Sequence, residues 1–237
     1  MPEPFRFKQF TVHQEHAAMK VGTDGVLLGA WARSKEAKQI LDIGTGTGVI
    51  ALQCAQRNDK ANITAVEIDS GAQQDAVNNF TCSPWAKRIT LQKQSIQNFT
   101  EETILRFDHI LCNPPFFEDT QSEKITARKV ARQQSQLTLE ELVKCVKILL
   151  VHNGSFSVIY PYAQMQEVIQ LMEKHELYLN RRTVVRGRIG AKPKRVLLSF
   201  ANRKNTIEED ELTIERHHRH AYTQEYINLT KAFYLQF

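Results

Sequence analysis

The sequence is poor in cysteine and has no long apolar run, and each absence limits what the protein can be. Its four cysteines lie about 30 positions apart with no C-x-x-C pair, which argues against a structural zinc and for reduced, buried thiols. No stretch is both apolar and long enough to cross a bilayer, and the first residues have no apolar signal core. We therefore expect a cytoplasmic protein with no metal, no membrane association and no obligate protein partner.

A chain of 237 residues with 42% hydrophobic content can bury one large core, so residues 1–237 are expected to form a single domain. Short apolar runs predict strands at Gln39–Ile43, Asn62–Ile68, Ile89–Lys93, Phe107–Cys112, Ser155–Tyr160, Thr183–Arg188 and Arg195–Phe200. Helical periodicity predicts helices at Val49–Arg57, Ala72–Phe80, Leu137–Leu150 and Ala163–Lys174, and a final amphipathic unit from Glu208 to Phe237. This alternation is typical of an α/β fold. We expect a doubly wound, mostly parallel seven-stranded sheet with an antiparallel hairpin at one edge.

Basic residues are concentrated in two segments. The formal net charge is +5, a small excess whose placement matters more than its size. One segment contains Lys124, Arg128, Lys129 and Arg132; the other contains Arg181, Arg182, Arg186, Arg188, Lys192, Lys194 and Arg195, with no acid between them. Both segments are either solvated surface or a binding surface for a polyanion. Because the first follows a candidate active site, nucleic acid is the preferred partner.

That candidate active site is the segment Asn113-Pro114-Pro115-Phe116, which directly follows a predicted buried strand. Each proline fixes its own φ and keeps the residue before it out of the helical region, so the segment is extended and rigid. The Asn113 side-chain oxygen and the Pro114 carbonyl can then accept the two hydrogens of a planar amine, while Phe116 covers its face. Adenine carries such an amine. Phe117 is either a second wall of this site or a core residue.

A glycine-rich loop follows the first predicted strand. Asp42 precedes Gly44, Gly46 and Gly48, and glycines at these positions permit a tight turn and close approach of the backbone to a ligand. A dinucleotide-binding loop needs glycine or alanine where this sequence has Val49. The spacing therefore indicates a site for S-adenosylmethionine (SAM) and not for NAD.

Glu67 and Ile68 lie at the end of the second predicted strand and complete the expected cofactor site. A carboxylate at this place can accept both ribose hydroxyls of a bound nucleoside, whereas the nearby Asp69 suits a helix cap. With the glycine loop and Asn113, these residues predict a SAM-dependent methyltransferase that acts on an amine.

With these motifs the sequence resembles class I SAM-dependent methyltransferases, and more narrowly the bacterial tRNA(Val) adenine-37 N6-methyltransferase family. The resemblance covers nearly the whole chain, including Phe10–Val12, Met19–Trp31 and Tyr222–Tyr226. It implies a Rossmann-like catalytic core at residues 39–237 and an N-terminal extension, residues 1–38, that packs near the cofactor.

The resemblance also implies roles for further residues. Lys20, Gly22 and Thr23 would lie near the methionine part of SAM, and Ser95 would stand where many such enzymes present an aspartate to the cofactor's adenine. The substrate would be tRNA, methylated at adenine 37 of the anticodon loop, with the base stacked on Phe116. The basic stretch from Arg181 to Arg195 would then hold the phosphates of the anticodon arm, and Lys124, Arg128 and Lys129 are also expected to bind the RNA.

Other interpretations remain open from the sequence. The same motifs serve enzymes that methylate guanine N2 in ribosomal RNA, and a related fold methylates glutamine side chains of proteins. A non-catalytic RNA-binding module is a further alternative, and an NAD-dependent dehydrogenase is disfavoured by Val49. The histidines His217, His218 and His220 do not have the spacing of a metal site, so they are interpreted as basic surface.

Overall fold

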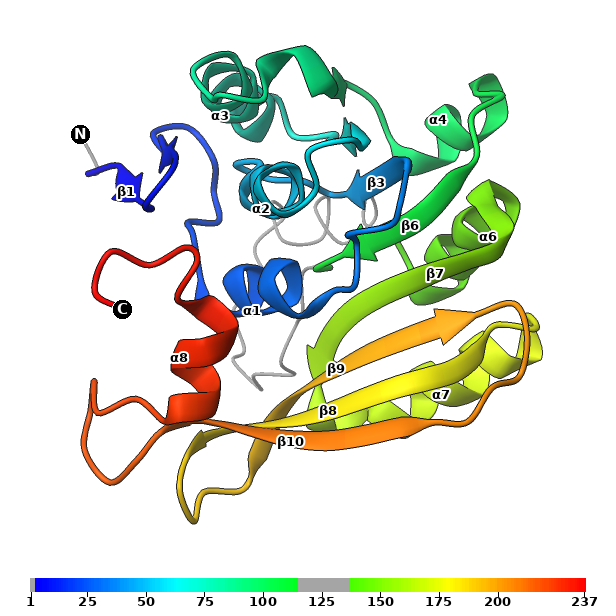
Figure 1. Cartoon of the computed structure of the whole chain (residues 1–237). Helices are drawn as coiled ribbons and strands as arrows, with labels where there is room; N and C mark the ends of the chain where they lie inside the picture. The colour runs from blue at the N-terminus through cyan, green and yellow to red at the C-terminus, as the bar shows by residue number, and fades with distance from the viewer. Residues whose placement is uncertain (1–2, 115–136) are drawn as a thin grey trace, which may run out of the picture.

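An eight-stranded sheet runs through the part of the computed structural model that can be described, residues 3–114 and 137–237 (Figure 1). Its strands, in spatial order, are β10 (Glu208–Glu215), β8 (Tyr178–Arg188), β9 (Pro193–Ala201), β7 (Leu150–Pro161), β6 (Phe107–Cys112), β3 (Gln39–Ile43), β4 (Asn62–Val66) and β5 (Ile89–Gln92). The five strands from β7 to β5 are parallel to one another. Strand β9 is antiparallel to both neighbours, and β10 lies parallel to β8.

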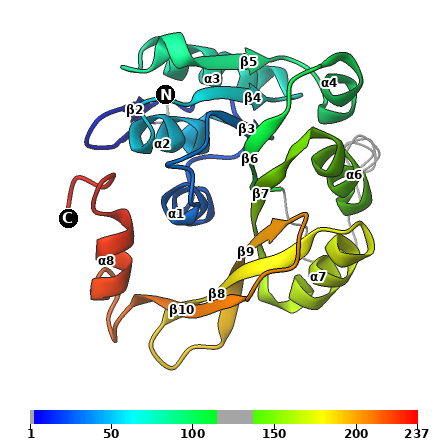
Figure 2. The same cartoon turned by 45° about the vertical axis from the view of Figure 1, so that its right-hand side comes forward.

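Helices cover both faces of this sheet (Figure 2). One face carries α1 (Thr23–Trp31), α2 (Val49–Arg57), α3 (Ser70–Thr81) and α8 (Gln224–Thr230), and the other carries α4 (Ile96–Glu102), α6 (Leu139–Leu149) and α7 (Met165–Lys174). Short 3-10 turns occur at Ala86–Arg88 and Tyr162–Gln164. The buried side chains divide into two clusters, one on each face, so the sheet separates two cores.

Local sequence signals set several helix ends. Asp69 caps α3 by accepting a hydrogen bond from the backbone N–H of Ala72, as its position in the sequence predicted. Thr138 and Glu141 form a reciprocal capping box at the start of α6. These caps satisfy N–H groups that have no partner inside the helix.

The predicted α/β class is confirmed, but two details of the predicted sheet are wrong. The hairpin of β8 and β9 is not at the edge of the sheet, because β10 pairs with β8 beyond it. The sheet consequently has eight strands and not seven. The segment from Glu208 to Phe237, expected to form one amphipathic unit, begins with strand β10, and α8 lies in its second half.

The two ends of the described chain meet beside α8 (Figure 1). Strands β1 (Phe5–Arg6) and β2 (Thr11–Val12) form a small antiparallel pair, and Phe7 makes a β-bridge to Tyr234. The segment that follows β2 is attached to α3, where the Asp75 carboxylate accepts three backbone N–H groups of residues 15–17. In the part of the chain described here, no helix is long and apolar enough to cross a membrane.

One buried polar group lies in the middle of the sheet. His109 on β6 is 2% exposed; its Nδ1 lies 3.2 Å from the Arg33 carbonyl and its Nε2 lies 2.9 Å from the Ser157 hydroxyl. Since a carbonyl only accepts, Nδ1 carries the ring proton and donates it, and Nε2 accepts from Ser157. Burial lowers the pKa of His109 from 6.5 to about 4, and the nearby charge of Arg57 acts in the same direction.

We expect this histidine to make folding stability depend on pH. Below pH 6.5 an unfolded histidine binds a proton that the folded, buried ring does not accept until the pH reaches about 4. The contribution of His109 to the free energy of unfolding therefore has its full value above pH 6.5 and is lost as the pH falls from 6.5 to about 4. The loss from this group is about 3 kcal/mol. Urea unfolding on both sides of this range should show a smaller loss for His109→Gln than for the wild type.

The exposed His152 on β7 provides the control, because His152→Gln removes an imidazole that the sheet does not bury. If His109→Gln and the wild type lose the same amount of folding stability over this pH range, the folded protein does not keep His109 neutral.

Candidate active site

The predicted site residues meet because their strands are neighbours. Strand β3 pairs with β4 on one side and with β6 on the other, and Ile43 is in register with both Val66 and Cys112. The next residues along the three strands are Gly44, Glu67 and Asn113. All three therefore emerge at the carboxyl ends of parallel strands, where an open α/β sheet binds its ligands.

The glycine loop has a backbone that only glycine adopts easily. Gly44, Gly46 and Gly48 have φ values of 66°, 57° and 87°. A Cβ at Gly44 or Gly46 would meet nothing within 4 Å, whereas one at Gly48 would run into the ring of Phe80. The first two glycines thus border open space, and the third is required by packing against α3.

Glu67 fixes the shape of this loop through both carboxylate oxygens. Its Oε2 accepts from the Gly46 N–H at 2.8 Å, and its Oε1 accepts from the N–H groups of Ile68 at 2.9 Å and Asp69 at 2.8 Å. The side chain is only 8% exposed. An ionised carboxylate accepts about four hydrogen bonds, so one position on Oε2 remains for a ligand hydroxyl. The role of Glu67 in ordering its own loop was not anticipated from the sequence.

Asp42 lies beneath the loop and is closed off from solvent. Its Oδ2 accepts from the hydroxyl of Thr45 at 2.5 Å and from the N–H of Ala51 at 3.2 Å. Burial raises the pKa of Asp42 to about 7; these two hydrogen bonds act against the rise, and the charge of Glu67 adds to it. Its other oxygen has no donor among the described residues. Asp42 therefore joins the start of α2 to the glycine loop.

Asn113 presents an unused acceptor. Its Oδ1 is buried and has no hydrogen-bond partner in the described part of the chain. A buried acceptor without a donor costs about 1–3 kcal/mol, so its presence calls for an explanation. Helix α1 comes close enough that a Cβ at Gly25 would lie 3.8 Å from the Asn113 Nδ2 and 3.3 Å from Val49. Pro114 is buried beside it.

Four further predicted cofactor residues are placed around the same edge. The ammonium of Lys20 binds the carbonyls of Gln14 and Ala17, so it holds the N-terminal segment in place. Gly22 and Thr23 are exposed at the start of α1. Ser95 caps α4 by accepting from Asn98, which leaves its hydroxyl proton free. Direct contacts from these residues to a cofactor remain predictions.

Ile68 is an exposed apolar side chain within this set. It is 61% exposed although its neighbour Glu67 is buried. An apolar side chain at this position can cover the face of a planar base, and this contact stays a prediction.

A cavity of about 670 Å³ opens beside the first turn of α1. Its walls include Thr23 and Asp24 from that turn and Pro193, Lys194 and Arg195 from the start of β9. Asp24 accepts a hydrogen bond from the Arg195 side chain at 2.8 Å. The cavity therefore lies between the first turn of α1 and the start of β9.

The basic hairpin is less positive than its sequence implies. Strand β10 lies beside β8 and carries five acids. Ion pairs join Arg181 to Asp210, Arg182 to Glu209, Arg186 to Glu211 and Arg188 to Glu215. The sequence gives no acid within the hairpin itself, but the fold brings these acids from a later strand. Lys192 and Lys194 are exposed at its tip.

Several predicted residues lie outside the described part of the chain. These are Pro115, Phe116, Phe117, Lys124, Arg128 and Lys129. Their assignment to base stacking and phosphate binding stays a prediction. Among the described residues, no group of three or more His, Cys, Asp or Glu side chains has the geometry of a metal site.

Two solved structures that are similar to this one are described as methyltransferases. A crystal structure described as a predicted O-methyltransferase from Agrobacterium tumefaciens matches with a TM-score of 0.70 over 89% of this chain and 96% of that chain, at 19% sequence identity. A precorrin-6y C5,15-methyltransferase from Geobacter metallireducens matches with a TM-score of 0.52 over 79% of this chain and 93% of that chain, at 13% identity. At such identities the likeness shows the shared fold alone.

Sequence comparison is more specific. Residues 16–175 match the family model described as the methyltransferase small domain. A protein of Flavobacterium psychrophilum named tRNA1(Val) (adenine(37)-N6)-methyltransferase is 45% identical over 98% of this chain and 99% of its own length. Proteins with the same name from Phocaeicola vulgatus and Trichodesmium erythraeum are 46% and 41% identical, over 99% and 98% of this chain and of their own lengths. The chain therefore belongs to the methyltransferase small-domain family and, within it, to the family of tRNA1(Val) (adenine(37)-N6)-methyltransferases.

Proposed function

We propose that this protein transfers a methyl group from SAM to the exocyclic N6 of adenine 37 in the anticodon loop of tRNA1(Val). The methyl donor is SAM, and the enzyme class is tRNA methyltransferase, in keeping with the family to which the chain belongs. The observation that carries the proposal for this site is the buried, unused Oδ1 of Asn113 beside the glycine loop. This oxygen can accept a hydrogen bond from a ligand, and the amine of adenine is a suitable donor.

The residues at the sheet edge fit SAM. Gly44 and Gly46 leave open space where any other residue would place a side chain. Glu67 retains one acceptor position for a ribose hydroxyl, and exposed Ile68 offers an apolar surface to the adenine. We assign Asp42 to holding the loop in shape, because it is buried beneath the backbone. Lys20, Gly22, Thr23 and Ser95 complete the proposed set.

Bound SAM supplies a methyl group on a sulfonium, which is open to in-line attack by a nitrogen lone pair. In free adenine the lone pair of N6 is delocalised into the ring. The Asn113 oxygen and the Pro114 carbonyl accept both N6 hydrogens and hold the nitrogen pyramidal, with its lone pair toward the methyl group. Neither acceptor is a strong base, so the proton is lost to water after transfer. Phe116 stacks on the base, which must first leave its neighbours in the loop.

Labelled SAM and total tRNA that lacks its native methyl groups provide the test, followed by nucleoside analysis. N6-methyladenosine confined to one valine tRNA supports the proposal. Label in N2-methylguanosine, in ribosomal RNA or in protein would assign the enzyme to one of the alternative substrates. Absence of transfer would favour a non-catalytic RNA-binding protein.

We also propose that the enzyme acts in the cytoplasm, where tRNA is modified. Residues 1–237 act as a single domain, and residues 1–38 form an extension of the catalytic core. The attachment of residues 15–17 to α3 supports this arrangement.

The tip of the basic hairpin should account for part of the salt dependence of tRNA binding. Lys192 and Lys194 are exposed, and no hydrogen bond or ion pair to a described residue engages their side chains. Each lysine that neutralises a phosphate releases about one counterion. Changing both lysines to glutamine should reduce the slope of log affinity against log salt by about 1.5. A filter-binding titration at several salt concentrations measures this slope.

The matched control replaces the exposed Lys35 and Lys60, which precede β3 and β4 at the opposite end of the parallel strands. If both double variants reduce the slope equally, Lys192 and Lys194 contribute no more to RNA binding than other exposed lysines do.

A further inference from the structure

A second cavity lies on the α1 face of the sheet, away from the carboxyl ends of its parallel strands. Its volume is about 280 Å³. Its floor consists of the polar side chains of His109, Ser155, Ser157 and Ser199 from β6, β7 and β9. Positions on the same face one step closer to the active-site edge are apolar, as Ile159 and Leu197 are. Helix α1 ends at Trp31, before the polar part of this face.

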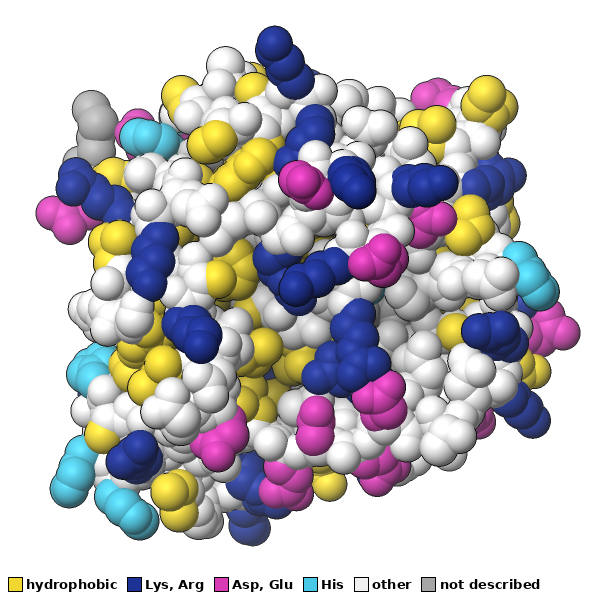
Figure 3. All heavy atoms as spheres, in the orientation of Figure 1, with side chains coloured by type: hydrophobic (Ala, Val, Ile, Leu, Met, Phe, Trp, Pro, Cys, Tyr) yellow, Lys and Arg dark blue, Asp and Glu magenta, His cyan; other side chains and the backbone are white. Residues whose placement is uncertain are grey.

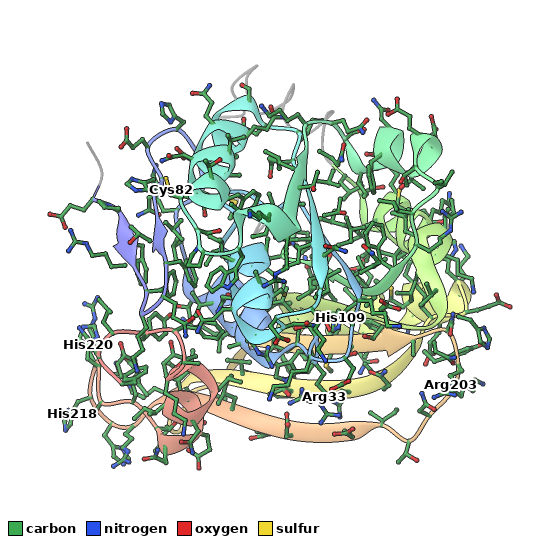
Figure 4. All side chains as sticks on the ribbon, turned by 45° about the horizontal axis from the view of Figure 1, so that its top comes forward. Arg33, Cys82, His109, Arg203, His218 and His220 are labelled. Atoms are coloured by element: carbon green, nitrogen blue, oxygen red, sulfur yellow. The ribbon has the colours of Figure 1, made fainter. Side chains whose placement is uncertain are left out.

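Arginines surround this floor. Arg33, Arg181 and Arg203 line the cavity, and Glu208 is the one acid among the lining residues. Figure 3 shows Lys and Arg side chains gathered near the centre of this face, next to a recess, and Figure 4 shows that Arg33, His109 and Arg203 come from three separate segments. Glu208 is already occupied, because both of its oxygens bind Arg33 at 2.7 Å. Arg181 is paired with Asp210, so the uncompensated positive charge of the cavity comes from Arg203.

Two buried polar atoms of the lining have no hydrogen-bond partner among the described residues: the donor Nε of Arg181 and the acceptor Oδ1 of Asn180. The guanidinium of Arg181 stacks on Trp31 at 4.2 Å. Its terminal nitrogens donate to the Trp31 carbonyl and to Asp210, so Nε is the nitrogen left without an acceptor among the described residues.

Arg203 forms no ion pair with any described residue, and Ser199 makes no side-chain hydrogen bond to one. The Nδ1 of His109 also lies 3.3 Å from the Ser155 Oγ, so its one proton is shared between the Arg33 carbonyl and Ser155. Ser155 accepts in this contact and keeps its own proton for another acceptor.

We infer that this cavity is a binding site for one phosphate group, with Arg181, Arg203, Ser155 and Ser199 as donors to its oxygens. Tetrahedral phosphate offers several acceptor oxygens and suits a site with guanidinium forks and hydroxyls. A carboxylate ligand would be attracted by the same positive charge, but it has fewer oxygens to accept hydrogen bonds from these donors. The neutral His109 contributes no charge; it orients Ser155 and Ser157. The phosphate belongs either to a small phosphorylated molecule or to the backbone of bound RNA.

The primary measurement is a calorimetric titration of the full chain with inorganic phosphate at constant ionic strength. We expect saturable binding at a single site. Arg203→Gln and Ser155→Ala should each weaken it by about tenfold, because each removes a hydrogen bond to a charged ligand. Arg203 is exposed, so its replacement does not disturb the core. Arg219→Gln, at an exposed arginine in the loop after β10, is the matched control and should leave phosphate binding unchanged.

A parallel titration with tRNA distinguishes the two sources of phosphate. If phosphate competes with tRNA and Arg203→Gln weakens both, the site holds a backbone phosphate of RNA. If tRNA affinity is the same in the presence of phosphate and in Arg203→Gln, the site serves a small phosphorylated ligand. The inference is overturned if phosphate gives no saturable binding, or if Arg203→Gln and Arg219→Gln weaken it equally. Methyl transfer need not be measured, so this result is independent of the catalytic proposal.

Discussion

Replacing Asn113 by alanine is expected to lower the methyl-transfer rate by about 10²–10³-fold while the protein stays folded. The expected loss follows from the removal of one of two preorganised acceptors for the N6 hydrogens. The stability should be unchanged to within about 1 kcal/mol or should rise, because the Asn113 oxygen is buried with no donor and its removal leaves no group unpaired. Single-turnover methylation, SAM titration and urea unfolding of the same variant test the three parts of this expectation.

Asn202 offers a matched control at the opposite end of the sheet. Its Oδ1 is also buried without a described partner, but it follows the end of β9, away from the glycine loop. Asn202→Ala should retain activity. Near-normal turnover by a folded Asn113→Ala variant that binds SAM would show that Asn113 does not activate the amine.

Two alanine substitutions in the glycine loop should separate cofactor binding from folding. At Gly46 a Cβ meets no protein atom within 4 Å, so the cost to stability is the left-handed backbone alone, about 1–2 kcal/mol. The same Cβ projects into the space assigned to SAM, and the affinity for SAM should fall by at least about tenfold. At Gly48 a Cβ lies 2.8 Å from the Phe80 Cζ, so the steric cost adds to the backbone cost. Gly48→Ala should lose about 2–5 kcal/mol of stability.

Calorimetric SAM titration and urea unfolding measure both effects. Gly187→Ala on β8 is the control, since a Cβ there meets nothing within 4 Å and the position needs no positive φ. Normal SAM affinity in Gly46→Ala would remove this loop from the cofactor site, whatever its effect on folding.

Three elements have bounds that depend on their own residues, and the sequence predicted them correctly. The strands at Gln39–Ile43 and Phe107–Cys112 and the helix at Val49–Arg57 have the predicted bounds. The two strands are short apolar segments that end at a glycine or proline turn, and the helix begins directly after Gly48, so local chemistry sets these bounds. The predicted doubly wound fold places Gly44 and Asn113 at the carboxyl edge of the sheet, whereas the pairing of their two strands came from the structure.

The sequence patterns did not predict helix α1, because the helix contains two glycines. Gly25 and Gly29 lower helix propensity, and each has a tertiary reason: Gly25 admits Asn113 and Val49, and a Cβ at Gly29 would lie 2.7 Å from the Gln53 Cδ. A close helix crossing of this kind depends on a partner far along the chain. The pairing of basic β8 with acidic β10 was missed for the same reason, since no local pattern specifies which strands become neighbours.

The acidic strand that balances the arginines also occupies the exposed border of the sheet. A border strand presents unpaired N–H and C=O groups, to which a strand of another molecule can add. Residues 208–211 of β10 are exposed and consist of Glu-Glu-Asp-Glu. A second copy of the same strand would bring like charges together and be repelled. Strand β10 therefore protects the free enzyme from edge-to-edge aggregation, in addition to limiting where RNA can bind.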